Sequence, residues 1–308
     1  MKIAVFGTGG VGGYFGARLA KAGADVHFVA RGRHLAAIRE RGLRVTSALG
    51  DVALKPAQAT DDPAEIGTAD VVMVAVKLYD TDDAAARIKP LVGPRTTVVS
   101  FQNGVTAGDT FDAAFGRERT IGGSCSIAVR ISEPGVIEHT GTMASIAFGE
   151  WDGSRSPRTE ALLAAFAKAG VDATLADDIE TVIWSKFIFL ASFSGITCLM
   201  RLPIGPIRAD AEARAMHRRA IEEAVAVARA RGVGLPADIV DKRMTFTDGL
   251  PAGMYASMYH DLATEKRLEL FWLSGAVVRM GRQLKVPTPT HENYWLALKL
   301  HADGKPAP

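Results

Sequence analysis

The sequence predicts an α/β fold, a Rossmann-type doubly wound sheet followed by an all-α C-terminal domain. Two observations predict it. In the first half, short apolar runs alternate with helical patterns, which is typical of βαβ units and a parallel sheet. After about residue 175 the strand patterns fade, and long helical patterns separated by proline or glycine take over.

The individual elements follow from these patterns. KIAVFG (2–7) is an apolar strand, and VGGYFGARLAKAG (11–23) is a helix that ends in glycine. Further strands are expected at 24–31, 69–77 and 96–104, and alternation with turn residues at 120–150 indicates antiparallel strands at the sheet edge. Helices are expected at 178–199, 209–231 and 254–281. We therefore predict two domains, 1–175 and 176–308, with a cleft between them.

Composition narrows the function classes. The 308-residue chain is 48% hydrophobic with a net charge of +2, which gives no global reason to expect nucleic acid or membrane partners. Cys125 and Cys198 show no paired spacing, the histidines form no zinc motif, and the apolar window Phe187 to Met200 is too short and serine-rich for a bilayer. We expect a cytoplasmic protein without a metal.

A glycine-rich turn follows the first strand. It has the pattern G-x-G-x-x-G, with a strand before it and a helix after it, and consists of Gly7, Thr8, Gly9, Gly10, Val11 and Gly12. Glycines let backbone amides approach a pyrophosphate at a helix N-terminus. The alternative is a glycine turn without a ligand, but the strand–turn–helix context favours dinucleotide binding.

The residue at the end of the second expected strand indicates which dinucleotide binds. An NAD site usually has an acidic residue there, whereas this strand ends in Arg31. A guanidinium can bind a 2′-phosphate through two parallel hydrogen bonds, so NADP(H) is the predicted cofactor. The alternative is an ordinary solvated basic helix start.

Lys186 is the second unusual feature. It lies within IETVIWSKFIFLASFSGITCLM (179–200), among apolar side chains on both sides. Burying an unpaired ammonium is unfavourable, so a specific role or a partner is expected. The alternative is that its stem covers apolar surface while its head reaches water.

Several of these segments together resemble one family. GTGGVGGYFGARLAKAGADVHFVAR, VAVKLYD, SFQNGV, IWSKF and SMYHDLATEKRLELFWLSG, in this order, resemble ketopantoate reductases (2-dehydropantoate 2-reductases). The resemblance implies NADPH-dependent reduction of a 2-oxo acid to the 2-hydroxy acid, with 2-dehydropantoate and pantothenate biosynthesis as the first expectation. It also implies a small-molecule partner, and the apolar faces of 254–281 allow a homodimer contact.

The resemblance also assigns residue roles. It implies that Lys186 is the general acid and that Glu269 lies beside the nicotinamide and the substrate. The remaining implied contacts are Lys77, Asn103 and Ala128 for NADP, and Asn103, Lys186, Leu190, Ser194 and Ser257 for substrate. Domain closure would bring Lys186 and Glu269 over the nicotinamide.

The chemistry agrees with these roles. Reducing a 2-oxo acid generates an alkoxide, so the site needs a proton donor and positive charge at that oxygen. Lys186 in an apolar cleft would supply both, and Glu269 would offset its burial. The alternatives are a helix-surface charge for Glu269 and ordinary strand-end polar residues for Lys77 and Asn103.

The departures from the family pattern concern the substrate. Asparagines usual four and eight residues after the lysine are Leu190 and Ser194 here, and Phe271 and Ser274–Gly275 replace an acidic–Asn–Gly pattern. Gln102 replaces a common histidine. Because leucine offers no hydrogen bond, a more apolar 2-oxo acid is one alternative substrate. A non-catalytic NADP-binding sensor is another.

Overall fold

The computed structural model describes residues 1–305. The chain divides into two compact units, the first covering Met1–Val182 and the second beginning at Ile183. The long helix α6 (Ile179–Met200) begins in the first unit and continues in the second. An α/β unit therefore precedes an all-helical one, as the sequence predicts.

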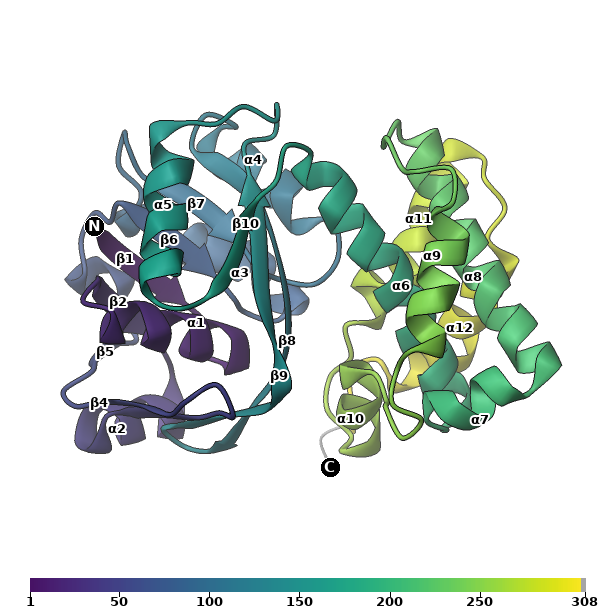
Figure 1. Cartoon of the computed structure of the whole chain (residues 1–308), viewed down its shortest axis with the longest axis horizontal. Coiled ribbons are helices and arrows are strands. Elements are labelled where there is room, and N and C mark those ends of the chain that lie inside the picture. Colours follow the sequence, from purple (N-terminus) through teal and green to yellow (C-terminus); the bar gives the residue numbers. More distant parts are fainter. Residues whose placement is uncertain (306–308) are drawn as a thin grey trace. The chain divides into compact units, whose positions relative to one another are not determined.

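A mixed, mostly parallel sheet forms the frame of the first unit (Figure 1). Within the described residues it has ten strands, in the order β4-β3-β9-β8-β7-β6-β1-β2-β5, with β10 beside β9. The strands are β1 (Lys2–Phe6), β2 (Asp25–Val29), β3 (Leu43–Thr46), β4 (Val52–Leu54), β5 (Gln58–Thr60), β6 (Val71–Val74), β7 (Thr97–Ser100), β8 (Thr120–Glu133), β9 (Val136–Gly149) and β10 (Asp172–Leu175). The predicted antiparallel pair at 120–150 is confirmed as β8 and β9.

Alternation along the central strands explains why helices cover both faces of this sheet. Ile3 and Val5 belong to one buried cluster, whereas Ala4 and Phe6 belong to another. The first cluster includes side chains of α1 (Gly10–Lys21), α2 (Gly32–Arg41) and α5 (Pro157–Lys168). The second includes α3 (Thr81–Arg87) and α4 (Ala107–Phe115). A doubly wound arrangement results because successive side chains of a strand point to opposite faces.

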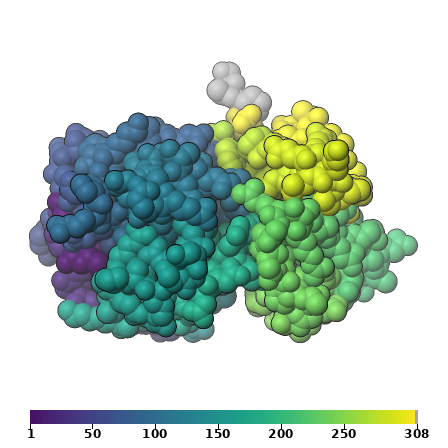
Figure 2. All heavy atoms as spheres, turned by 90° about the horizontal axis from the view of Figure 1, so that it is seen from above, coloured from purple at the N-terminus to yellow at the C-terminus, as the bar shows by residue number. Residues whose placement is uncertain are grey.

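The second unit is helical throughout its described part. After α6 it contains α7 (Ile204–Ala209), α8 (Ala211–Ala230), α9 (Ile239–Asp248), α10 (Ser257–Ala263), α11 (Ser274–Leu284) and α12 (Pro289–Leu298). In Figure 2 the yellow C-terminal segment lies against the green segment that precedes it, and α11 and α12 both contact α8. The N-terminus of α8 is capped by Asp210, whose carboxylate accepts from Ala213 N at 2.8 Å.

The single helix expected at 254–281 is wrong. The segment forms α10, a 3₁₀ turn η4 (Leu270–Trp272) and α11. The helix ends because Glu265 adopts a left-handed conformation (φ 53°), and the amide of Leu268 then donates to Ala302 O at 2.8 Å. This hydrogen bond joins the break to the C-terminal segment, which a local pattern does not reveal.

The apolar helix α6 is a core helix. Its 22 residues reach the length that could cross a membrane, more than the apolar window alone suggested. Of its most apolar window, however, 61% is buried inside the structure. Phe193 and Ile196 pack in a cluster with Ile204 and Tyr294, so the apolar character reflects packing against other helices.

Candidate active site

The glycine-rich turn has the backbone that its sequence predicts. Gly7 has φ 98°, and a Cβ there would lie 2.7 Å from Val76 Cγ1. A Cβ on Gly12 would collide with the carbonyl oxygen of Gly7. Both positions therefore require glycine, one for its backbone conformation and both for the close approach of neighbouring atoms.

Hydrogen bonds hold this turn to the second strand. The amides of Gly7 and Thr8 donate to Val29 O at 3.2 and 3.1 Å, and the buried Thr8 hydroxyl donates to the same oxygen at 3.0 Å. The turn leads into α1, whose first turn contains no acidic residue and whose N-cap Gly9 provides no side-chain cap. The first amides of α1 thus have neither a side-chain cap nor a competing acidic group in that turn, an arrangement suited to a phosphate.

The predicted cofactor residues lie along one edge of the sheet. Strands β8, β7, β6, β1 and β2 are consecutive neighbours, and each pairing between them is parallel. In that order, the strand or the loop that follows it contributes Ala128, Asn103, Lys77, the glycine turn and Arg31. Ligands of open α/β sheets bind at this carboxyl edge.

Gln102 connects two of these positions. Its side-chain amide donates to Lys77 O at 3.3 Å and to Thr81 Oγ1 at 2.8 Å, and its carbonyl oxygen accepts from Ser100 Oγ at 2.9 Å. Gln102 directly precedes Asn103 and is 8% exposed. The residue that replaces a common histidine therefore brings the loop after β7 and the loop after β6 together.

Ala128 lies where β8 is irregular. The pairing of β8 with β9 shifts register between Ile127 and Val129, which leaves Ala128 at the irregularity. The next residue, Val129, lies over the glycine turn, since a Cβ on Gly10 would be 2.8 Å from its Cγ2. The irregular part of β8 therefore covers the turn.

Arg31 has a partner that sequence reasoning missed. Its Nη2 donates to Asp80 Oδ2 at 3.0 Å, and the Arg31 side chain is 77% exposed while that of Asp80 is 25% exposed. Arg31 precedes α2, and Asp80 lies in the 3₁₀ turn η2 (Leu78–Asp80) after β6. No local signal links residues 49 positions apart, although their strands both neighbour β1.

In the second unit Lys186 is half-buried on α6. Leu190 and Ser194 follow at intervals of four residues, so all three share one side of the helix. Leu190 is half-buried, but Ser194 is fully buried, and its hydroxyl has no hydrogen-bond partner among the described residues. Ser194 therefore belongs to the helical core here and presents no surface to solvent.

Glu269 is buried, with 4% exposure, and directly precedes η4. Its backbone oxygen accepts from Trp272 and Leu273 at 3.0 and 3.1 Å. Ser274 begins α11 five residues later, and its hydroxyl donates to Ala191 O on α6 at 3.5 Å. This contact fixes the segment that carries Glu269 against the part of α6 that follows Lys186.

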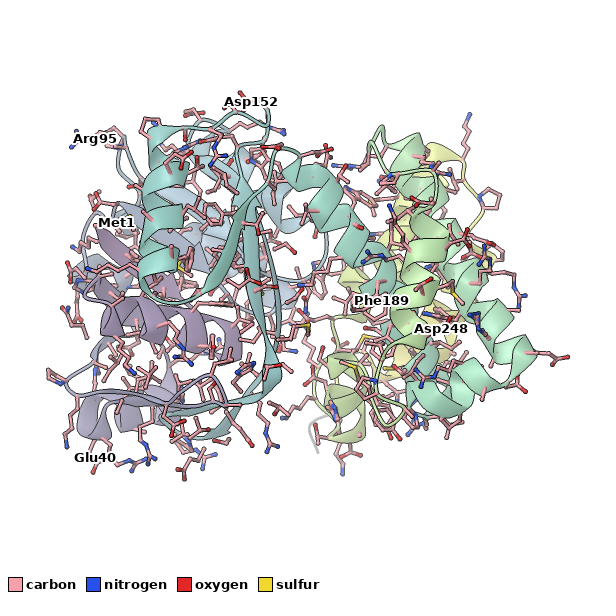
Figure 3. All side chains as sticks on the ribbon, in the orientation of Figure 1. Met1, Glu40, Arg95, Asp152, Phe189 and Asp248 are labelled. Atoms are coloured by element: carbon pink, nitrogen blue, oxygen red, sulfur yellow. The ribbon has the colours of Figure 1, made fainter. Side chains whose placement is uncertain are left out.

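Ser257 is the first residue of α10 and is exposed. The preceding residue, Ala256, is 2% exposed and packs in the cluster with Phe193 of α6. Phe189 of α6 packs against the same cluster, and its ring meets the ring of Phe246 on α9 edge to face, with centroids 4.9 Å apart. Figure 3 labels Phe189 on α6 and Asp248, the last residue of α9. Aromatic side chains therefore lie one helical turn from Lys186.

Among residues 1–305 no group of three or more metal-ligating side chains occurs. Two fully buried histidines of the second unit, His217 and His291, instead have structural partners. The imidazole Nε2 of His291 lies 2.9 Å from Ala220 O, and that of His217 lies 3.2 Å from Thr247 Oγ1. Burial lowers the pKa of each ring to about 4.

An α/β unit with a glycine-rich turn between its first strand and first helix, followed by a helical unit with a half-buried lysine and a buried glutamate, is typical of a class of dinucleotide-dependent oxidoreductases. The sequence model of ketopantoate reductase PanE/ApbA matches residues 3–153, and that of its C-terminal part matches residues 178–302. The chain belongs to the ketopantoate reductase PanE/ApbA family.

Individual relatives support this family membership, because their similarity extends over nearly the whole chain. A 2-dehydropantoate 2-reductase of Mesorhizobium japonicum is 36% identical over 94% of both chains. An uncharacterized oxidoreductase, YkpB, of Bacillus subtilis is 31% identical over 99% of this chain and 100% of the relative.

Solved structures agree as well. A PanE/ApbA family ketopantoate reductase from Ralstonia eutropha superposes with a TM-score of 0.90 at 31% identity, covering 98% of both chains. D-mandelate dehydrogenase, solved with NADH and anilino(oxo)acetate, shares the fold with a TM-score of 0.89 over 98% of both chains at 20% identity.

Proposed function

We propose that this protein reduces a 2-oxo acid to the 2-hydroxy acid with NADPH, and that 2-dehydropantoate is the first substrate to test. The observation that carries the proposal is the half-buried Lys186 on the apolar helix α6, with the buried Glu269 held against the same helix through the contact between Ser274 and Ala191. We place the activity in the cytoplasm.

The first unit would hold the cofactor. The glycine turn offers amides to the pyrophosphate, and the exposed guanidinium of Arg31 is suited to a 2′-phosphate. Lys77 and Asn103, tied together by Gln102, would hold the part of the cofactor that extends toward β7. When bound, NADPH supplies the hydride that the reduction needs.

Lys186 would act on the substrate oxygen. As the C2 carbonyl is reduced its oxygen becomes an alkoxide, and the ammonium donates a proton to it while neutralising the developing charge. The lysine then regains a proton from solvent. The carboxylate of Glu269 would balance the ammonium charge in partly apolar surroundings, and the Ser257 hydroxyl would bind the substrate.

A second candidate substrate is a 2-oxo acid with an apolar side chain. Leu190, one turn after Lys186, can only make apolar contacts, and the Ser194 hydroxyl is buried inside the helical unit. Leu190 and Ser194 stand where the family pattern has asparagines, so neither position offers an amide group to the substrate. A site without those groups is expected to discriminate by shape and apolar contact rather than by hydrogen bonds.

One experiment tests these alternatives. NADPH consumption is measured with 2-dehydropantoate and with 2-oxo acids that carry branched aliphatic or aromatic side chains, and kcat/KM is compared. Preference for 2-dehydropantoate supports the first proposal, and preference for an apolar acid supports the second. Binding of NADPH without consumption of it in the presence of any 2-oxo acid indicates a sensor and contradicts both.

A further inference from the structure

The ion pair between Arg31 and Asp80 joins the two loops that flank the glycine turn of the predicted cofactor site. Arg31 follows β2 and Asp80 follows β6, and the strand between them is β1, which leads into the glycine turn. The backbone of the turn is itself held on these two sides. The amides of Gly7 and Thr8 donate to Val29 O at the end of β2, and a Cβ on Gly7 would lie 2.7 Å from Val76 Cγ1 after β6. The pair therefore connects the segments on either side of the turn.

The two side chains differ in how strongly they are fixed. Asp80 is the better buried partner at 25% exposure, and its amide donates to Lys77 O at 2.9 Å. Arg31 reaches it from the exposed start of α2 with 77% of its side chain accessible. The carboxylate is thus the anchored member, and the guanidinium is the one that can turn toward another anion.

We propose that Asp80 is a specificity-determining residue that lowers the preference for NADPH over NADH. This inference rests on the proposed function. A 2′-phosphate on Arg31 must share or replace the carboxylate that the guanidinium already binds, and it must tolerate a second negative charge nearby. NADH has no 2′-phosphate, so it avoids this competition.

The expected size of the effect is modest. Two negative groups near the protein surface repel weakly in a water-like dielectric and more strongly where water is excluded. Removing the charge of Asp80 should therefore tighten NADPH binding about three- to tenfold at low salt, and the gain should shrink as ionic strength rises. NADH binding should change by less than about twofold.

The test compares dissociation constants of NADPH and NADH for the wild type and Asp80→Asn, measured by nucleotide fluorescence at low and high salt. Asp82→Asn is the matched control, because it removes an exposed acidic charge from the first turn of α3, two residues after Asp80, without changing a partner of Arg31. Asp80→Ser repeats the test in case asparagine perturbs the turn. An increased NADPH:NADH affinity ratio in both Asp80 variants, but not in the control, is the expected result.

The Arg31→Ala background identifies the mechanism. There the Asp80→Asn change should no longer alter the ratio, because the charge it competes for is gone. An unchanged ratio in the wild-type background, or weaker NADPH binding in Asp80→Asn, would overturn the inference and make Asp80 a support for Arg31. If the wild type binds neither nucleotide, the proposed function fails, and the role of Asp80 fails with it.

Discussion

The ring of Tyr294 packs directly over Gly195. A Cβ added to Gly195 would lie 2.7 Å from Cε2 and 2.8 Å from Cγ of that ring, and Tyr294 is completely buried. Helix α12 can therefore approach α6 only because position 195 lacks a side chain. Close packing of these two helices thus accounts for the glycine that follows Ser194.

Gly195→Ala should destabilise the protein by about 1–3 kcal/mol, because the methyl group overlaps a ring that cannot move outward. Urea denaturation measures the change. Gly253→Ala is the control, since nothing lies within 4 Å of a Cβ at that exposed position and its stability should change by less than about 0.5 kcal/mol. Equal effects in the two variants would contradict the packing account.

Local signals were sufficient for the backbone of the glycine turn, for the positions of the central strands and for the long helix α6, because each depends on a pattern that is continuous in sequence. The Arg31–Asp80 pair and the break at Glu265 were missed. Both depend on contacts between distant segments, the first across β1 and the second with Ala302. The roles assigned to Lys186 and Glu269 stay predictions.

Stability should fall between pH 6.5 and 4. Burial lowers the pKa of His217 and His291 to about 4, whereas the unfolded rings titrate near 6.5. In this window the unfolded chain binds more protons, so stability rises with pH and is lost as pH falls through the window. The loss is on the order of 3 kcal/mol for each ring at pH 4.

Urea denaturation at several pH values measures this slope. Besides burial, Arg214 and His291 lower the pKa of His217, and Asp248 opposes that effect. His217→Gln should reduce the pH dependence of the free energy of unfolding by about half, although it lowers that free energy at pH 7. His260→Gln is the control, because that ring is exposed. An unchanged slope in His217→Gln would show that the acid sensitivity has another source.

Gln102→Leu should weaken cofactor binding more than it weakens the fold. The leucine keeps the volume but loses hydrogen bonds to Lys77 O, Thr81 Oγ1 and Ser100 Oγ, so the loops after β6 and β7 are no longer joined. We expect a dissociation constant for NADPH about five- to twentyfold higher and a stability loss of about 1–3 kcal/mol. Nucleotide fluorescence and urea denaturation measure the two effects. A stability loss with unchanged NADPH affinity would limit Gln102 to a structural role.

Lys186→Ala should lower kcat by about 10²- to 10⁴-fold with whichever 2-oxo acid the protein accepts, because the alkoxide then loses its proton donor. NADPH affinity should stay within about threefold, since the predicted cofactor residues lie in the first unit.

Lys186→Arg keeps the charge but is a much weaker acid, so it should recover binding of the substrate without recovering most of kcat. A matched change one turn on, Leu190→Ala, should alter KM and the order of preferred substrates more than kcat for the best one. Full turnover in Lys186→Ala, with the fold intact by urea denaturation, would show that the proton comes from elsewhere.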